Sequence, residues 1–153
     1  ITFAAHYAKN KPEYDMYFIA FSGEDANLRG SDWYVEHPVV PLSQIKFLFN
    51  LDMIADNNPK QYCEFNDVAM NGYALFEQIN AEKGYFEALD RHELDENSDH
   101  WPFAKKNVPV VLFMNEHGDA YKYYHTVHDT YENHISTNYE PSFKLIENFI
   151  KKY

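Results

Sequence analysis

Residues Ile45–Ile54 read IKFLFNLDMI, an apolar run that is interrupted only by Lys46, Asn50 and Asp52. A run of this length is too short to cross a membrane and is typical of a strand that is buried on both faces of a sheet. A carboxylate inside such a strand loses its hydration, so Asp52 needs a partner that compensates for the loss. We therefore interpret Asp52 as a functional residue near the end of a buried strand.

Buried strands and helices alternate on both sides of this run. The alternation predicts an α/β fold: a three-layer sandwich with a mainly parallel mixed sheet and helices on both faces. There is no internal repeat and no linker, so we expect a single domain over residues 1–153. The other predicted strands are residues 15–21, 62–65 and 108–114, and the predicted helices are residues 1–10, 26–35, 68–83 and 142–152.

The composition limits the possible partners of the chain. It has 153 residues, of which 45% are hydrophobic, and this is enough to build a core. Its formal net charge is −11 and its basic residues form no cluster, which argues against a nucleic acid or an anionic membrane surface as a partner. No run reaches transmembrane length. Cys63 is the single cysteine, so no internal disulfide forms and the redox compartment stays open.

Acidic residues follow the ends of the predicted strands. The run MYFIAFS leads into Gly23-Glu24-Asp25, and Asp52 lies near the end of its own strand. Residues 108–114 precede a loop that ends in Tyr124 and His125. In open α/β sheets, ligands bind at the carboxyl ends of the strands. Carboxylates and an imidazole that meet there are typical metal ligands, so the pattern indicates a metal site.

Simpler interpretations exist for several of these residues. Residues 24–25 precede the predicted helix at 26–35, and acids are favourable near a helix N-terminus. Residues 98–99 fit the N-cap of a helix that starts at Trp101. His125 and the histidine three residues later fit an ordinary surface pair. Each interpretation stays open for its own segment, whereas Asp52 has no such alternative.

Four segments taken together resemble the co-catalytic di-zinc aminopeptidase family, which includes aminopeptidase Y, bacterial leucyl aminopeptidases and glutaminyl cyclases. Four motifs in the family's order and spacing, across essentially the whole chain, form a specific signal. The resemblance implies the family's α/β fold and a secreted or periplasmic protein. The segments are FIAFSGEDANLRGSDWYVEHP (18–38), IKFLFNLDMI (45–54), NSDHWPF with NVPVVLF (97–113) and YYHTVHDT (123–130).

The resemblance also implies a role for each motif residue. Glu24 matches the general base, which takes a proton from the metal-bound water and passes it to the leaving amine. Zinc lowers the pKa of that water to about 7. The zinc ligands implied are Asp25, Asp52 and His125. The residues implied to line or support the site are Asp99, His100, Tyr124 and Asp129, the last of which orients the loop of His125.

The chain departs from the family pattern in two places. The family usually has Glu at the position of Asp25, a side chain one methylene longer. A complete family domain holds two zinc ions, and its remaining His ligand and bridging Asp lie upstream of the position of Glu24. We therefore expect no stable di-zinc centre in this chain. We also expect either that another copy or the missing N-terminal segment supplies the family's N-terminal strands, through strand exchange or an intermolecular sheet, or that the chain repacks with an altered strand order.

Three functions follow from these observations. The first is a zinc-dependent aminopeptidase that hydrolyses N-terminal peptide bonds of peptides with a free N-terminus, with this chain incomplete for catalysis. The second is a non-catalytic peptidase-like fold that acts in binding or assembly. The third is a glutaminyl cyclase-like acyltransferase. The motifs do not specify a preferred substrate side chain.

Overall fold

Four strands form one open sheet in the computed structural model, which describes residues 1–54, 60–114, 123–133 and 139–153. The outer pairs, β1 with β4 and β2 with β3, are parallel, and the central pair, β2 with β4, is antiparallel. The predicted mixed sheet with mainly parallel pairing is therefore confirmed. In order across the sheet, the strands are β1 (Leu48–Leu51), β4 (Val110–Met114), β2 (Lys60–Phe65) and β3 (Ala88–His92).

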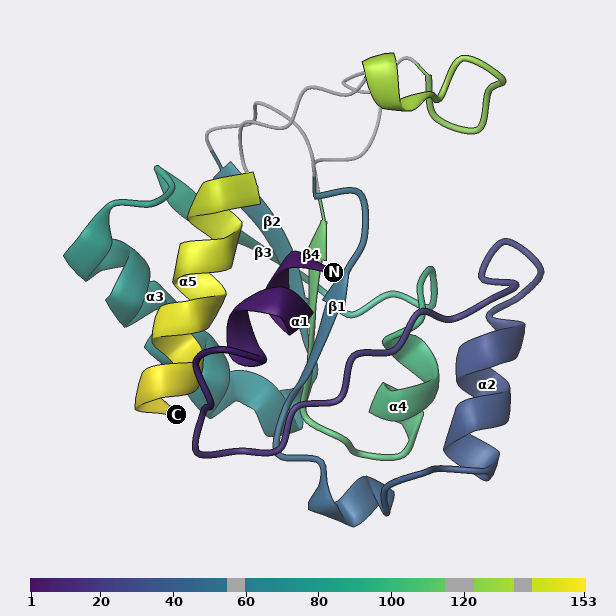
Figure 1. Cartoon of the computed structure of the whole chain (residues 1–153), viewed down its shortest axis with the longest axis horizontal. Helices are drawn as coiled ribbons and strands as arrows, with labels where there is room; N and C mark the ends of the chain where they lie inside the picture. Colours follow the sequence, from purple (N-terminus) through teal and green to yellow (C-terminus); the bar gives the residue numbers. More distant parts are fainter. Residues whose placement is uncertain (55–59, 115–122, 134–138) are drawn as a thin grey trace.

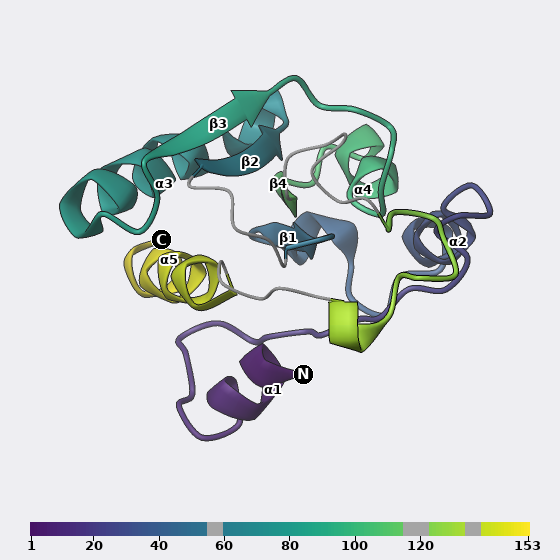
Figure 2. The ribbon, with the colours of Figure 1, turned by 90° about the horizontal axis from the view of Figure 1, so that it is seen from above.

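Helices cover both faces of this sheet, as predicted (Figures 1 and 2). One face carries α3 and α5, and the other carries α2 and α4. Within the described residues, no helix combines the length and the apolar character that crossing a bilayer requires. The helices are α1 (Thr2–Tyr7), α2 (Arg29–Glu36), α3 (Met70–Lys83), α4 (Trp101–Lys105) and α5 (Tyr139–Lys152), and 3₁₀ turns occur at Leu42–Gln44, Asp67–Ala69 and Tyr131–Asn133.

The strand β4 is the centre of the hydrophobic core. All five of its residues are buried. Side chains alternate across a strand, so Val111 and Phe113 pack under α3 and α5, whereas Val110 packs on the other side, against α2 and α4. This explains why the run is apolar at every position and does not alternate with polar residues.

Aromatic rings fill the layer between the sheet and its helices α3 and α5. Phe76 of α3 is fully buried and stacks on Phe149 of α5, with ring centroids 4.1 Å apart and planes 9° from parallel. Phe113 of β4 meets Phe76 edge-on at 5.2 Å. Helix α3 ends at Gly84, as predicted, because this residue adopts the left-handed conformation (φ 66°).

The strand predicted over residues 15–21 is wrong. These residues form no strand, and among the described residues they pair with none of β1 to β4. The trace from α1 to α2 runs beyond β1, on the side away from β4 (Figure 2). A strand needs a neighbour for its backbone groups, so an apolar sequence alone is not sufficient. Phe18, on this trace, is consequently 49% exposed.

The sequence also gave no indication of β3. Its residues, ALDRH, include two charged side chains and do not resemble a buried strand. An edge strand tolerates such a sequence because it pairs on one side only, here with β2.

Substitutions at two phenylalanines compare how much the core and this outer trace contribute to stability. We expect Phe76→Ala to lower the free energy of unfolding by about 3–5 kcal/mol, because it leaves a cavity in the aromatic layer. Phe18→Ala should change it by less than about 0.5 kcal/mol, as is usual for an exposed side chain. Urea denaturation measures both. A large, concentration-dependent loss for Phe18→Ala would contradict this, and would instead support the intermolecular sheet expected from the sequence.

Candidate active site

Glu24 and Asp25 lie in a tight turn that precedes α2. The N–H groups of Ala26 and Arg29 both donate to the carbonyl of Gly23, at 3.2 and 3.1 Å. Gly23 itself has a φ of 70°, which favours glycine. Helix α2 starts at Arg29 and not at Ala26, so neither acid lies in its first turn. The interpretation of these acids as partners of the helix N-terminus is therefore wrong.

The first and last motifs of the sequence meet at Asp25. Its Oδ1 lies 3.4 Å from Nε2 of His125, and both side chains are exposed. Tyr124 stacks on the His125 ring with centroids 3.9 Å apart. His125 adopts a φ of 54°, an uncommon conformation for a residue with a side chain. A carboxylate and an imidazole that are 100 positions apart in the sequence thus face each other across the site.

Asp52 has the partner that its position requires. It follows β1 directly, and its N–H extends the sheet by donating to the carbonyl of Phe113 at 3.0 Å. Its Oδ2 accepts a hydrogen bond from the Ser98 hydroxyl at 2.7 Å, and the Ser98 oxygen in turn accepts one from Nδ2 of Asn50, also at 2.7 Å. This chain of hydrogen bonds fixes the orientation of the Asp52 carboxylate.

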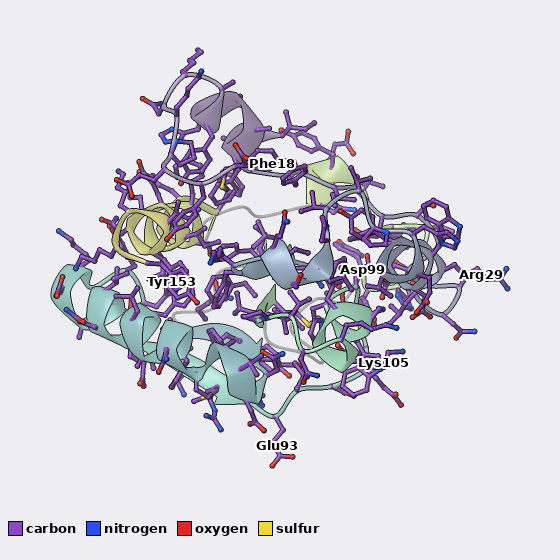
Figure 3. The ribbon with its side chains drawn as sticks, turned by 90° about the horizontal axis from the view of Figure 1, so that it is seen from below. Phe18, Arg29, Glu93, Asp99, Lys105 and Tyr153 are labelled. Atoms are coloured by element: carbon purple, nitrogen blue, oxygen red, sulfur yellow. The ribbon has the colours of Figure 1, made fainter. Side chains whose placement is uncertain are left out.

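Asp99 reaches from the loop before α4 to α2. Its Oδ1 accepts a hydrogen bond from the buried Ser31 hydroxyl at 2.6 Å, and Figure 3 labels it in the region between β1 and α2. The N-cap of α4 is His100, which makes no capping hydrogen bond with its side chain. The alternative that Ser98 or Asp99 serves to cap this helix is therefore wrong, because both side chains bind other elements.

The electrostatics of Glu24 show that these segments converge. Burial raises the pKa of Glu24, and the negative charges of Asp52, Asp25 and Asp99 raise it further, while His125 acts in the opposite direction. Four acids from three different segments therefore influence one another. Crowded carboxylates of this kind are typical of functional sites, where proton affinity is tuned.

The neighbouring groups respond to the same charges. The pKa of Tyr124 is raised by burial and then by the carboxylates of Glu24, Asp52 and Asp25. The pKa of Asp99 is raised by burial and by Asp52, against the opposing effects of the Ser31 hydrogen bond and of His100. Tyr124 and Asp99 thus belong to the same acidic cluster as Glu24.

The structure places the two remaining predicted residues at the margin of this cluster. His100 is fully buried behind Asp99, 3.3 Å from Glu64. Asp129 lies in the turn after His125, where its N–H donates to the carbonyl of Thr126 at 3.2 Å. Its role in orienting the loop stays a prediction. The preceding residues, 115–122, lie outside the described part of the chain.

The side chains present suit zinc in type, since zinc binds imidazole and carboxylate ligands. Their arrangement does not by itself form a metal site, however. In the portions of the chain that the structure describes, no three His, Cys, Asp or Glu side chains lie close enough together to hold a metal ion. Asp25 is paired with His125, whereas Asp52 is anchored separately by Ser98.

Sequence reasoning missed the supporting residues Ser31 and Asn50. Asn50 gave a usable signal, because it precedes Asp52 by two positions and side chains two apart in a strand share a face. Ser31 gave none, since its link to Asp99 joins residues 68 positions apart.

Asp99→Asn should remove charge repulsion while keeping the acceptor for Ser31. Because the pKa of Asp99 is raised in the folded state, the stability from its protonated form is present at acidic pH and is lost as pH rises above the ordinary value of 3.8. We therefore expect the variant to be more stable than the wild type at pH 7, by about 0.2–1 kcal/mol given the partial exposure. The difference should vanish near pH 3.

Thermal unfolding of both proteins between pH 3 and pH 8 measures this difference. Asp15→Asn, at an exposed position outside the cluster, controls for the loss of one negative charge. A variant that is less stable than the wild type at pH 7 contradicts the repulsion inferred here.

Comparisons with known proteins identify the family of the chain. The family described as Peptidase family M28 matches residues 1–150. Aminopeptidase YwaD of Bacillus subtilis (strain 168) is 32% identical over 129 residues, which make up 80% of this chain and 28% of that protein. The chain thus spans less than a third of the length of this curated relative.

Solved structures show the same fold. LapA of Legionella pneumophila superimposes with a TM-score of 0.75 at 19% identity, over 93% of this chain and 41% of that one. BSAP, a zinc aminopeptidase from Bacillus subtilis, superimposes with a TM-score of 0.64 at 25% identity, over 88% of this chain and 34% of that one. The family match over nearly the whole chain decides the assignment: the chain belongs to peptidase family M28.

Proposed function

We propose that this chain is the portion of a zinc-dependent aminopeptidase that supplies the general base and three of the zinc ligands. The observation that carries the proposal is the convergence on Glu24 of acids from the turn before α2, the end of β1 and the loop before α4, together with His125. Chance clustering of separate surface acids is unfavourable, because like charges repel. A bound cation would relieve that repulsion.

Glu24 suits the role of proton acceptor and donor. Its pKa is raised by burial and by its acidic neighbours. A general base works best when its pKa approaches the pH at which it acts. Glu24 would take a proton from the attacking water and return it to the leaving amine.

Asp25, Asp52 and His125 would each supply a zinc ligand: Asp25 is paired with His125, and Asp52 stands apart from them, oriented by Ser98. When bound, zinc would supply a water that ionises near neutral pH and would polarise the peptide carbonyl. The surrounding negative charge also suits a substrate whose free N-terminus carries a positive charge. Peptides with a free α-amino group are therefore the proposed substrates.

A second candidate is a non-catalytic member of the family that acts in binding or assembly. Two observations favour it for the 153-residue chain: Asp25 stands where the family usually has the longer Glu, and no three metal-binding side chains converge within the described residues. The two candidates differ in whether the chain takes up zinc.

Zinc titration by calorimetry distinguishes them. We expect the aminopeptidase portion to bind zinc, and Asp52→Asn to weaken binding by at least about tenfold, because the amide is a poorer ligand than the carboxylate. Asp32→Asn is the matched control, since Asp32 is an exposed acid of α2 that contacts Lys105. Absence of zinc uptake, with no effect of Asp52→Asn, supports the non-catalytic candidate.

Hydrolysis tests the role of Glu24. We would join the chain to the ligand-bearing segment that the family resemblance places upstream, and measure release of an aminoacyl amide with zinc present. Glu24→Gln should lower kcat by about 10²–10⁴-fold, the usual contribution of a general base. Gln preserves the size of the side chain, so zinc binding should remain. Activity that survives this substitution unchanged excludes Glu24 as the base.

A further inference from the structure

Glu64 is a carboxylate in the interior of the protein that the proposed chemistry does not use. It lies in β2, between β4 and β3, and its side chain is 0% exposed. Burying a carboxylate is unfavourable unless partners replace the lost water. The identity of these partners therefore indicates what the residue does.

Three groups compensate for the burial of Glu64. The Tyr62 hydroxyl donates to Oε1 at 2.7 Å, and the backbone N–H of Asp95 donates to Oε2 at 2.7 Å. Nε2 of His100, which is also 0% exposed, lies 3.3 Å from Oε2. Burial alone would raise the pKa of Glu64, but its contacts with His100, Tyr62 and Asp95 lower it, which favours the ionised carboxylate.

The contact with His100 is a close approach between two buried side chains. Neither ring nitrogen of His100 makes a directed hydrogen bond with any residue that the structure describes. Its Nε2 nevertheless lies 3.3 Å from Oε2 of Glu64, and both side chains are fully buried. His100 is thus held in place by close packing against Glu64.

Two of these partners stand at the two ends of one loop. Asp95 and His100 flank residues 96–99, and both contact the same oxygen of Glu64, Oε2. This one oxygen therefore holds both ends of the loop. Between them, Ser98 donates to Asp52 and Asp99 accepts from Ser31. The loop therefore joins the buried Glu64 on one side to the acidic cluster on the other.

We propose that Glu64 is a positioning residue for the candidate active site: it clamps loop 95–100 so that Ser98 orients the Asp52 carboxylate. The clamp follows from the contacts of Glu64 alone, whereas its effect on metal binding rests on the proposed function. Glu64 acts through Asp95, His100 and Ser98 and touches neither a ligand nor the substrate.

Hydrogen–deuterium exchange of the 153-residue chain tests the clamp without any metal. Glu64→Gln keeps the shape of the side chain and removes its charge, and should speed amide exchange in residues 95–100 by about tenfold or more. Exchange in β4 should not change. Tyr62→Phe is the matched control, because it removes a hydrogen bond of similar length from Glu64 but leaves both ends of the loop attached.

If Glu64→Gln does not fold, His100→Gln removes the imidazole that packs against Glu64 and should have the same effect on the loop. Unchanged exchange in residues 95–100 in the folded variant overturns the clamp. Equal acceleration by Tyr62→Phe also overturns it, because the effect would then reflect general loosening of β2.

A double-substitution cycle tests the link to the metal. Glu64→Gln and Ser98→Ala should each weaken zinc binding by about tenfold, the lower range for residues that orient a ligand. Combined, they should weaken it by little more than either alone, because Glu64 acts through Ser98. If the double variant instead loses zinc affinity by the product of the two single effects, Glu64 does not act through Ser98. A wild-type chain that takes up no zinc contradicts the proposed function instead, while the exchange experiment still decides the clamp.

Discussion

The pairing of β1 with β4 is the constraint on which the site depends. Four residue pairs, from Leu48 with Val110 to Leu51 with Phe113, fix the register of β1, and the N–H of Asp52 adds one more hydrogen bond at the end. Since β4 is buried on both faces, it cannot shift without exposing its apolar side chains. Asp52 consequently emerges at one defined point at the edge of the sheet.

The acidic cluster around that point opposes the stability of the fold. Glu24 and Asp99 both have a raised pKa, which means that the folded chain disfavours their ionised forms. Natural proteins tolerate such unfavourable arrangements mainly where function requires them. The hydroxyls of Ser31 and Ser98, which are neutral donors, offset part of this cost. This leaves the negative charge available for a cation.

Sequence reasoning succeeded where a pattern is local. The apolar pattern identified the strands β1, β2 and β4 and the helices α3 and α5. Each of these strands contains a run of apolar residues, and each of these helices has an apolar face. It failed for residues 15–21 and for Ala88–His92 for opposite reasons. The first segment has the composition of a strand but no partner among the described residues, and the second has a partner, β2, but not the composition. Pairing is a property of two segments, and one segment cannot report it.

The same distinction applies to the site. Family motifs identified the residues proposed to carry chemistry, including Glu24, Asp52 and His125, because reactive groups recur in recognisable local sequences. The supporting residues are Ser31, Asn50 and Glu64, which contact Asp99, Ser98 and the N–H of Asp95, at positions 68, 48 and 31 residues away. From the sequence alone, a buried carboxylate such as Glu64 cannot be distinguished from any other charged residue of a strand. Only the folded structure shows that its two loop contacts, Asp95 and His100, lie on either side of Ser98. The residues that support a site are therefore harder to recognise from the sequence than the residues that carry its chemistry.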